Sequence, residues 1–200
     1  MHPAISHLKQ SDPVLAAIID AVGPFTFNYC APGFSTLVRS IVNQQLSGKA
    51  AATILQRLID ACGGELSPDR ILKLRIPRMR VCGLSKQKLA YIRDLARLTR
   101  DGKLDFTSLP AKTDDEVVAT LTQVKGIGEW TAQIFLMFAL KRENVLPTGD
   151  LGIQNAIQRA YKKRRKVTPK HVAKMGKAWH PYRSVASWYL WRSLDGPAEI

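Results

Sequence analysis

A single carboxylate stands at the head of a helical pattern in the segment LPTGDLGIQ, residues 146–154. In that position Asp150 could stabilise a developing positive charge or orient a water molecule. It could also cap the helix that LGIQNAIQRAYKKR predicts after it, since aspartate is a favoured N-cap residue. The two roles are compatible, because the positive end of a helix favours a negative charge.

Two glycines separated by one residue lie earlier, in the segment VKGIGEWTAQ, residues 124–133. Gly126 and Gly128 carry no Cβ, so the turn between two helical patterns could approach a flat partner closely. The N–H groups that begin the following helix can bind phosphate, and Lys125 adds a positive charge beside them. Taken alone, Gly-x-Gly favours an ordinary helix–helix turn over a DNA-binding one.

The charge of the chain points to a polyanionic partner. Thirty Lys and Arg against sixteen Asp and Glu give a net charge of +14, and such a field attracts polyanions. We therefore expect nucleic acid, with a merely basic, ribosome-like protein as the alternative. The run YKKRRK, residues 161–166, is either a solvated face or a further DNA contact.

Composition argues against several other classes of protein. The longest apolar run falls short of the ~18 residues of a membrane span, and the N-terminus lacks an apolar signal region, so we expect a cytoplasmic protein. Cys30, Cys62 and Cys82 form no CxxC motif, and the four histidines lack metal-ligand spacing. Buried thiols are expected in place of a metal site or a disulfide framework. Two hundred residues suit one compact domain or two small lobes.

Helical patterns dominate the elements that must position these residues. Apolar residues recur at four-residue spacing in FSTLVRSIVNQQL, for example at Leu37 and Ile41, which predicts one buried face. Thr113 and Glu116 have the spacing of a capping box. The alternation in PFTFNY, residues 24–29, is too short and unpaired to predict a strand. The sequence therefore predicts an all-α fold. Ser11 with Pro13 predicts a helix start before residues 14–22, and Ser47 is a candidate cap for a helix over residues 48–62. Further helices are expected near residues 67–74, 85–102, 113–124, 129–138, 151–164, 168–179 and 181–194.

Longer stretches resemble a known family. LTQVKGIGEWTA resembles the hairpin of the helix-hairpin-helix DNA glycosylase superfamily, and LPTGDLGIQNAI resembles its segment with the essential aspartate. LVRSIVNQQLSGKAA and WHPYRSVASWYLWR resemble the 3-methyladenine-DNA glycosylase II branch. The resemblance runs from Phe34 to Arg192 in the family's order. It implies a short, single-module form with two helical lobes flanking a DNA-binding cleft. One lobe would span about residues 34–110, and the other would combine the N-terminal segment with about residues 111–200.

The resemblance also implies an activity. Such enzymes flip a damaged base out of double-stranded DNA and hydrolyse its N-glycosidic bond, here for alkylated bases of the 3-methyladenine and 7-methylguanine type. Asp150 would be the catalytic residue that stabilises an oxocarbenium-like sugar. Bifunctional relatives carry a lysine where this chain has Trp130, and tryptophan cannot form a Schiff base. We therefore expect a monofunctional enzyme that leaves an abasic site. Relatives often carry a second acid where this chain has Gly149, so Asp150 has no acidic helper.

Aromatic residues would form the base pocket. Trp130 and Trp191 match aromatic pocket positions of the family, where cation–π attraction would hold a cationic alkylated base. Phe135, Tyr182 and Trp188 are weaker candidates, and at Trp188 the helical spacing favours a core position over the pocket.

Other residues would contact the DNA. In the family, the loop that contains Gln45 enters the duplex and fills the gap left by the flipped base, while a solvated loop amide is the alternative. Ser47, Gly48 and Lys49 would bring a hydroxyl, N–H groups and a charge to a phosphate. The DNA-binding residues expected at the hairpin are Lys125, Gly126, Ile127, Gly128 and Thr131.

The resemblance implies that no cofactor is required, and the family's cluster of four cysteines for an iron–sulfur centre is absent from the sequence. The backbone carbonyls of Thr122, Val124 and Ile127 could hold a Na⁺ or K⁺ ion at the hairpin. We expect a monomer that acts at the bacterial nucleoid or in a eukaryotic nucleus. Two other interpretations stay open. One is a non-catalytic helix-hairpin-helix DNA-binding protein, and the other is a glycosylase for oxidised or deaminated bases.

Overall fold

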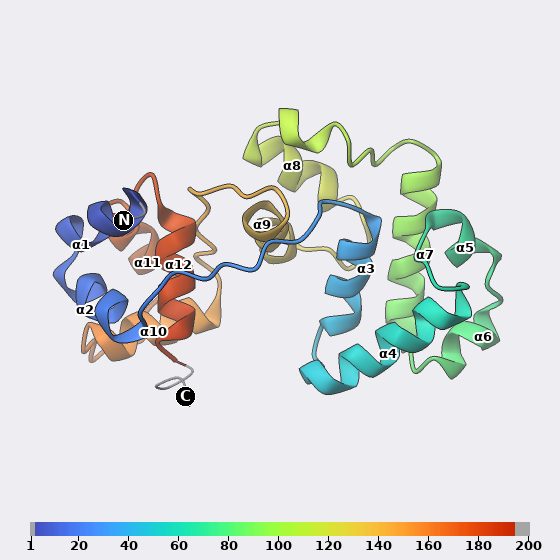
Figure 1. The fold of residues 1–200 in the computed structure, drawn as a ribbon, viewed down its shortest axis with the longest axis horizontal. Coiled ribbons are helices and arrows are strands. Elements are labelled where there is room, and N and C mark those ends of the chain that lie inside the picture. Colours follow the sequence, from blue (N-terminus) through green and yellow to red (C-terminus); the bar gives the residue numbers. More distant parts are fainter. Residues whose placement is uncertain (1–2, 195–200) are drawn as a thin grey trace. The chain divides into compact units, whose positions relative to one another are not determined.

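The computed structural model describes residues 3–194 as helices joined by loops, with no β-strand among them (Figure 1). The all-α prediction is confirmed for this part of the chain, and PFTFNY is an irregular segment. Between residues 3 and 194, no helix has the length and apolar character needed to cross a lipid bilayer. Packing divides the chain into two units: one contains the residues up to Tyr29 and those from Lys141 on, and the other is Cys30–Leu140.

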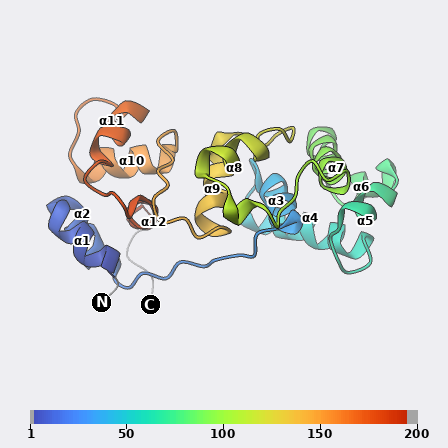
Figure 2. The same cartoon turned by 90° about the horizontal axis from the view of Figure 1, so that it is seen from above.

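The unit from Cys30 to Leu140 contains the helices α3 (Phe34–Asn43), α4 (Gly48–Ala61), α5 (Pro68–Lys73), α6 (Ile76–Val81), α7 (Lys86–Arg100), α8 (Asp114–Leu121) and α9 (Glu129–Phe138). Helix α7 packs against α3, α5 and α6 (Figure 1, Figure 2). The apolar face of α3 predicted from the four-residue spacing is confirmed, since Leu37, Val38, Ile41 and Val42 are fully buried.

Short polar side chains set the starts of these helices. Ser47, Ser67 and Ser85 each accept a backbone N–H three residues later and cap α4, α5 and α7. Thr113 and Glu116 form the predicted capping box of α8, in which the Thr113 N–H donates to Glu116 Oε2 at 2.7 Å. The caps predicted at Ser47 and Thr113 are thus confirmed.

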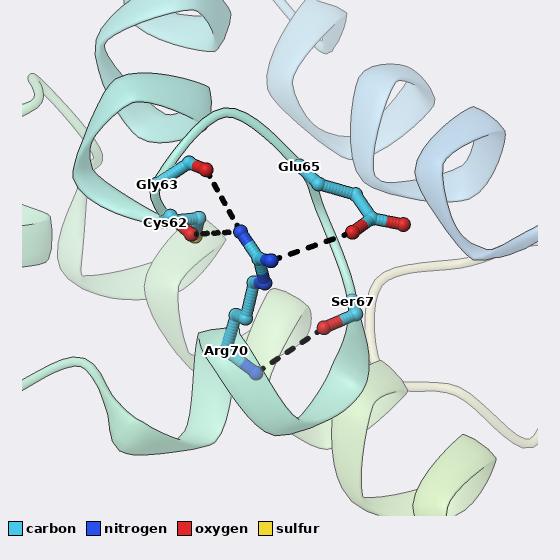
Figure 3. A network of polar contacts seen from close by, with 5 residues as sticks. All are labelled: Cys62, Gly63, Glu65, Ser67 and Arg70. Carbon is cyan, nitrogen blue, oxygen red and sulfur yellow. Dashed lines mark hydrogen bonds and ion pairs between the residues drawn. The ribbon is translucent and has the colours of Figure 1, made fainter.

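Arg70 holds the connection between α4 and α5 (Figure 3). Its Nη1 donates to the carbonyl oxygens of Cys62 and Gly63 at 2.9 and 2.8 Å, and its Nη2 lies 3.6 Å from Glu65 Oε2. A helix leaves its last carbonyls without internal partners. Arg70 therefore satisfies the end of α4, which stops where the sequence has two glycines.

The division of the chain differs from the predicted lobes, whose boundary was expected near residue 110. Both α8 and α9 belong to the Cys30–Leu140 unit. The hairpin between them is fixed there by side chains from earlier in the same unit: the Lys125 N–H donates to Asp94 Oδ2 at 3.0 Å, and Gln44 Nε2 donates to Gly126 O at 2.9 Å. The DNA-binding cleft expected between the lobes stays a prediction.

The other unit contains the helices α1 (Pro3–Ser11), α2 (Pro13–Val22), α10 (Leu151–Ala160), α11 (Pro169–Met175) and α12 (Arg183–Arg192). Helix α12 packs against α2 and α10. The buried Asp12 caps α2, and its Oδ2 accepts hydrogen bonds from the Trp179 indole N–H at 2.8 Å and from the Tyr161 hydroxyl. Burial and this carboxylate raise the pKa of the Tyr161 phenol, so the phenol remains a donor. The sequence predicted a helix start at Ser11, but Ser11 ends α1 and Asp12 provides the cap.

The three cysteines lie in different environments. Cys62 and Cys82 are buried, and burial raises the pKa of both thiols. Cys30 is exposed, contrary to the expectation of buried thiols, because it lies in the irregular segment before α3. In the described part of the chain, no three His, Cys, Asp or Glu side chains are grouped so as to hold a metal ion.

Candidate functional site

Asp150 lies at the N-terminal end of α10 and caps it. Its Oδ1 accepts hydrogen bonds from the Ile153 N–H at 2.8 Å and from the Trp191 indole N–H at 2.9 Å. The residue is 9% exposed. Two donors that meet on one oxygen fix the direction of the carboxylate. The predicted cap is confirmed, and the catalytic role stays a prediction.

Trp191 reaches this carboxylate from α12, and Gly152 makes room for the contact. A Cβ built at Gly152 would lie 3.0 Å from Asp150 Oδ1 and 3.1 Å from Trp191 Cδ1, which is tighter than an ordinary contact. The sequence predicted Trp191 as an aromatic wall of the base pocket. The structure adds that its N–H orients the acid.

Gln154 holds the loop that precedes Asp150. Its Nε2 donates to Thr148 O at 3.0 Å, and the residue is 7% exposed. The Asp150 N–H donates to Pro147 O at 3.0 Å. Because this buried amide donates to a loop carbonyl, Gln154 helps to position the loop before Asp150. The sequence analysis did not identify this residue. The signal was a glutamine on the inner face of α10.

A second group of predicted residues meets at a pocket in the Cys30–Leu140 unit, with a volume of about 630 Å³. Four of its lining residues were predicted to be functional: Gln45, Gly126 and Thr131 as DNA-binding residues and Trp130 as a wall of the base pocket. Trp130 is 49% exposed, so much of its indole faces solvent, as a stacking surface requires. The other lining residues are Ser40, Asn43, Gln44, Ser85, Gln87, Lys88, Tyr91 and Ile134.

The hairpin depends on Gly126, which has φ of 81°. A Cβ built there would lie 2.1 Å from Tyr91 Cδ2. The sequence suggested that this glycine lets the turn approach a flat partner such as DNA. In the structure, the group that the glycine approaches closely is the Tyr91 ring of the same unit. Ile127 is buried at 4% exposure, and Gly128 is the N-cap of α9, which therefore has no capping side chain. The predicted phosphate contacts at the start of α9 stay predictions.

The loop between α3 and α4 carries the exposed Gln45 and Leu46. Leu46 is 40% exposed, and an exposed apolar side chain beside a predicted wedge residue is a further candidate for insertion between bases. Sequence reasoning missed it. Lys88 reaches the same loop from α7, and burial lowers the pKa of its amine.

The residues predicted to bind a phosphate near α4 lie at its first turn. Ser47 Oγ accepts the Ala50 N–H at 3.4 Å, and Gly48 and Lys49 are exposed. The Ser47 hydroxyl is therefore already used as a cap. A phosphate contact by Lys49 stays a prediction.

Two of the candidate pocket aromatics are buried, and for Trp188 this agrees with the core position that the sequence favoured. Phe135 is 3% exposed and faces Phe106 with ring centroids 6.2 Å apart. Trp188 is 8% exposed and packs edge-on against Phe25 at 5.0 Å. Helical spacing turns both rings to inner faces, so they serve the core. Tyr182 is half-buried at the start of α12, and its pocket role stays a prediction.

Comparison with known proteins gives consistent matches. The family model for HhH-GPD superfamily base excision DNA repair proteins matches residues 38–181. The chain is 32% identical to DNA-3-methyladenine glycosylase 1 of Schizosaccharomyces pombe, in a match that covers 94% of this chain and 85% of the relative. Across the first three curated relatives, the match spans 66% to 92% of their length.

Solved structures agree with these matches. The crystal structure of DNA-3-methyladenine glycosidase from Bacillus halodurans is 38% identical with a TM-score of 0.87, and the match covers 96% of this chain and 88% of that one. A Schizosaccharomyces pombe 3-methyladenine DNA glycosylase in complex with abasic DNA is 30% identical with a TM-score of 0.87, and the match covers 96% of both chains. As its hairpin and aspartate segments predicted, this chain belongs to the HhH-GPD superfamily of base excision DNA repair proteins.

Proposed function

We propose that this chain is a monofunctional DNA glycosylase that releases alkylated bases, of the 3-methyladenine and 7-methylguanine type, from double-stranded DNA. The observation that carries the proposal is the Asp150 carboxylate, 9% exposed and oriented by Ile153 and Trp191. The family and the names of its relatives support the substrate class. A protein that only binds DNA through a hairpin would need neither the oriented acid nor the indole. The enzyme acts as a monomer, at the nucleoid of a bacterial cytoplasm or in a nucleus.

Asp150 acts on the sugar. As the bond between C1′ and the base nitrogen breaks, positive charge develops on the deoxyribose, and the carboxylate stabilises it. The alkylated purine is already cationic, so it leaves as a neutral base without a general acid. Water adds to C1′ and loses its proton to Asp150 or to solvent. The products are the free base and an abasic site.

Trp130 and Gln45 contact the DNA. Both are exposed and line the same pocket of the Cys30–Leu140 unit. The Trp130 indole would stack on the electron-poor base by cation–π attraction. Gln45, with Leu46 beside it, would occupy the gap in the duplex. Because tryptophan has no amine, the reaction stops at base release.

The hairpin would also hold a monovalent cation. Thr122, Val124 and Ile127 supply backbone carbonyls, the type of ligand that K⁺ takes in proteins. The Val124 carbonyl accepts the Ile127 N–H at 3.0 Å, and a carbonyl oxygen has a second lone pair with which it could also bind the ion. When bound, the ion would link the hairpin to a DNA phosphate. The hydrolysis itself consumes only water.

Base release from methylated DNA tests the proposal. DNA treated with dimethyl sulfate is incubated with the protein, and the freed bases are separated by chromatography. We expect 3-methyladenine and 7-methylguanine above the spontaneous rate of a protein-free control. Release of 8-oxoguanine or hypoxanthine from DNA that contains them, without methylpurine release, would assign a different lesion class. No release of any base would leave a DNA-binding protein.

A further inference from the structure

The loop after α3 has an unusual backbone. Helix α3 ends at Asn43, Gln44 is extended with φ −52° and ψ 125°, and Gln45 has φ 56°. Residues other than glycine rarely adopt this left-handed backbone conformation, and they keep it only where the surrounding structure holds them in it. The conformation of Gln45 therefore needs a physical support.

Lys88 provides that support from α7. Its Nζ donates to Val42 O at 2.7 Å and to Gln44 O at 2.6 Å. The first carbonyl belongs to the last turn of α3, where the helix dipole favours a cation. Charge-assisted hydrogen bonds are stronger than neutral ones. One ammonium thus holds the backbone on both sides of the residue where α3 ends.

Gln44 ties the loop down at a second point. Its Nε2 donates to Gly126 O, at 2.9 Å, in the turn of the hairpin. The side chain of Gln44 is therefore hydrogen-bonded within its own unit, while Gln45 is exposed. Of the two neighbouring glutamines, only Gln45 is presented outward.

We propose that Lys88 is a positioning residue that holds the Gln45 loop ready for insertion into the duplex. This inference rests on the proposed function, in which Gln45 fills the gap left by a flipped base. A loop that is already ordered avoids the entropic cost of ordering at the moment of insertion. Without the ammonium, the carbonyls of Val42 and Gln44 lose their donor and the left-handed turn at Gln45 loses its support.

Two readouts test the role of Lys88. The first is the single-turnover rate of methylpurine release, and the second is the fluorescence of 2-aminopurine placed beside a tetrahydrofuran abasic analogue, which reports unstacking. Lys88→Met should lower the rate roughly 10- to 100-fold, as misplaced groups do, and weaken the unstacking signal. Lys88→Arg keeps the charge and two donors, so it should stay within about threefold of wild type. Lys86→Met, an exposed lysine at the start of the same helix, is the matched control and should change neither readout.

A double-mutant cycle separates positioning from plain stabilisation. If Lys88 acts through Gln45, Lys88→Met should add little to Gln45→Ala in either readout. A lysine that only stabilises the fold would slow both backgrounds by the same factor, and that result would overturn the inference. If melting shows that Lys88→Met is unfolded, Lys88→Gln replaces it in the cycle. The unstacking signal needs no base release, so a wild-type protein that unstacks DNA but frees no methylpurine would overturn the proposed function alone. A wild-type protein that gives no unstacking would overturn the positioning role.

Discussion

The substitution Trp191→Phe would remove the indole donor to Asp150 Oδ1 while keeping an aromatic ring on α12. In the structure the indole N–H donates to Asp150 Oδ1 at 2.9 Å, beside the Ile153 N–H at 2.8 Å. A hydrogen bond to a charged group contributes about 1.5–3 kcal/mol, which corresponds to about 10- to 150-fold if all of it serves the transition state. Because Ile153 still holds the carboxylate, we expect the lower end, roughly a tenfold loss in rate.

The assay is single-turnover release of methylpurine under enzyme excess, with thermal melting to show that the variant is folded. Tyr189→Phe is the matched control, because it removes a hydrogen bond from the same helix, between the Tyr189 hydroxyl and Gly23 O at 3.0 Å. The control should lower the melting temperature by roughly 2–4 °C and leave the rate unchanged. A folded Trp191→Phe protein with the wild-type rate would show that the indole N–H has no part in orienting Asp150.

The remaining predictions concern the hairpin, the phosphates and Trp130. Gly126→Ala would place a Cβ 2.1 Å from the Tyr91 ring at a residue with φ of 81°. The free energy of unfolding should fall by about 2 kcal/mol or more, which lowers the melting temperature by roughly 4–8 °C. An unchanged melting curve would contradict this packing. Lys125→Ala and Lys49→Ala should each weaken binding equally on damaged and undamaged duplex and flatten its salt dependence, whereas a change confined to damaged DNA would mean that the lysine reads the base. Because the Trp130 side chain cannot form a Schiff base with the sugar, borohydride should trap no covalent adduct with lesion DNA, and reproducible trapping would reveal another attacking amine.

The helices were predictable where the signal is local. Ser47 and Thr113 cap helices through backbone groups three residues away, so the pattern is visible in the sequence. Helix α6 was missed because it has six residues and no continuous apolar face: Ile76 and Val81 are 54% and 77% exposed. The unit boundary was missed because the hairpin is tied to α7 by the contact of Lys125 with a side chain 31 residues away.

In the candidate site, too, contacts between residues close in sequence were predictable, whereas contacts between distant residues were not. The cap made by Asp150 to the Ile153 N–H was predictable, since the partners are three residues apart. The contact from Trp191 spans 41 residues, and that from Lys88 to Val42 spans 46, so only the folded chain reveals them. Phe135 was offered as a pocket residue although it is buried, because helical spacing cannot tell a ring that faces the core from one that faces a ligand.

Asp150→Asn tests the central claim most directly. Asparagine caps a helix nearly as well as aspartate, so the melting temperature should change little. The neutral amide cannot stabilise a cationic sugar, so methylpurine release under enzyme excess should slow by roughly 10²-fold or more, while binding to lesion DNA is retained. A folded variant that still releases 3-methyladenine at close to the wild-type rate would reduce Asp150 to a helix cap and contradict the proposed chemistry.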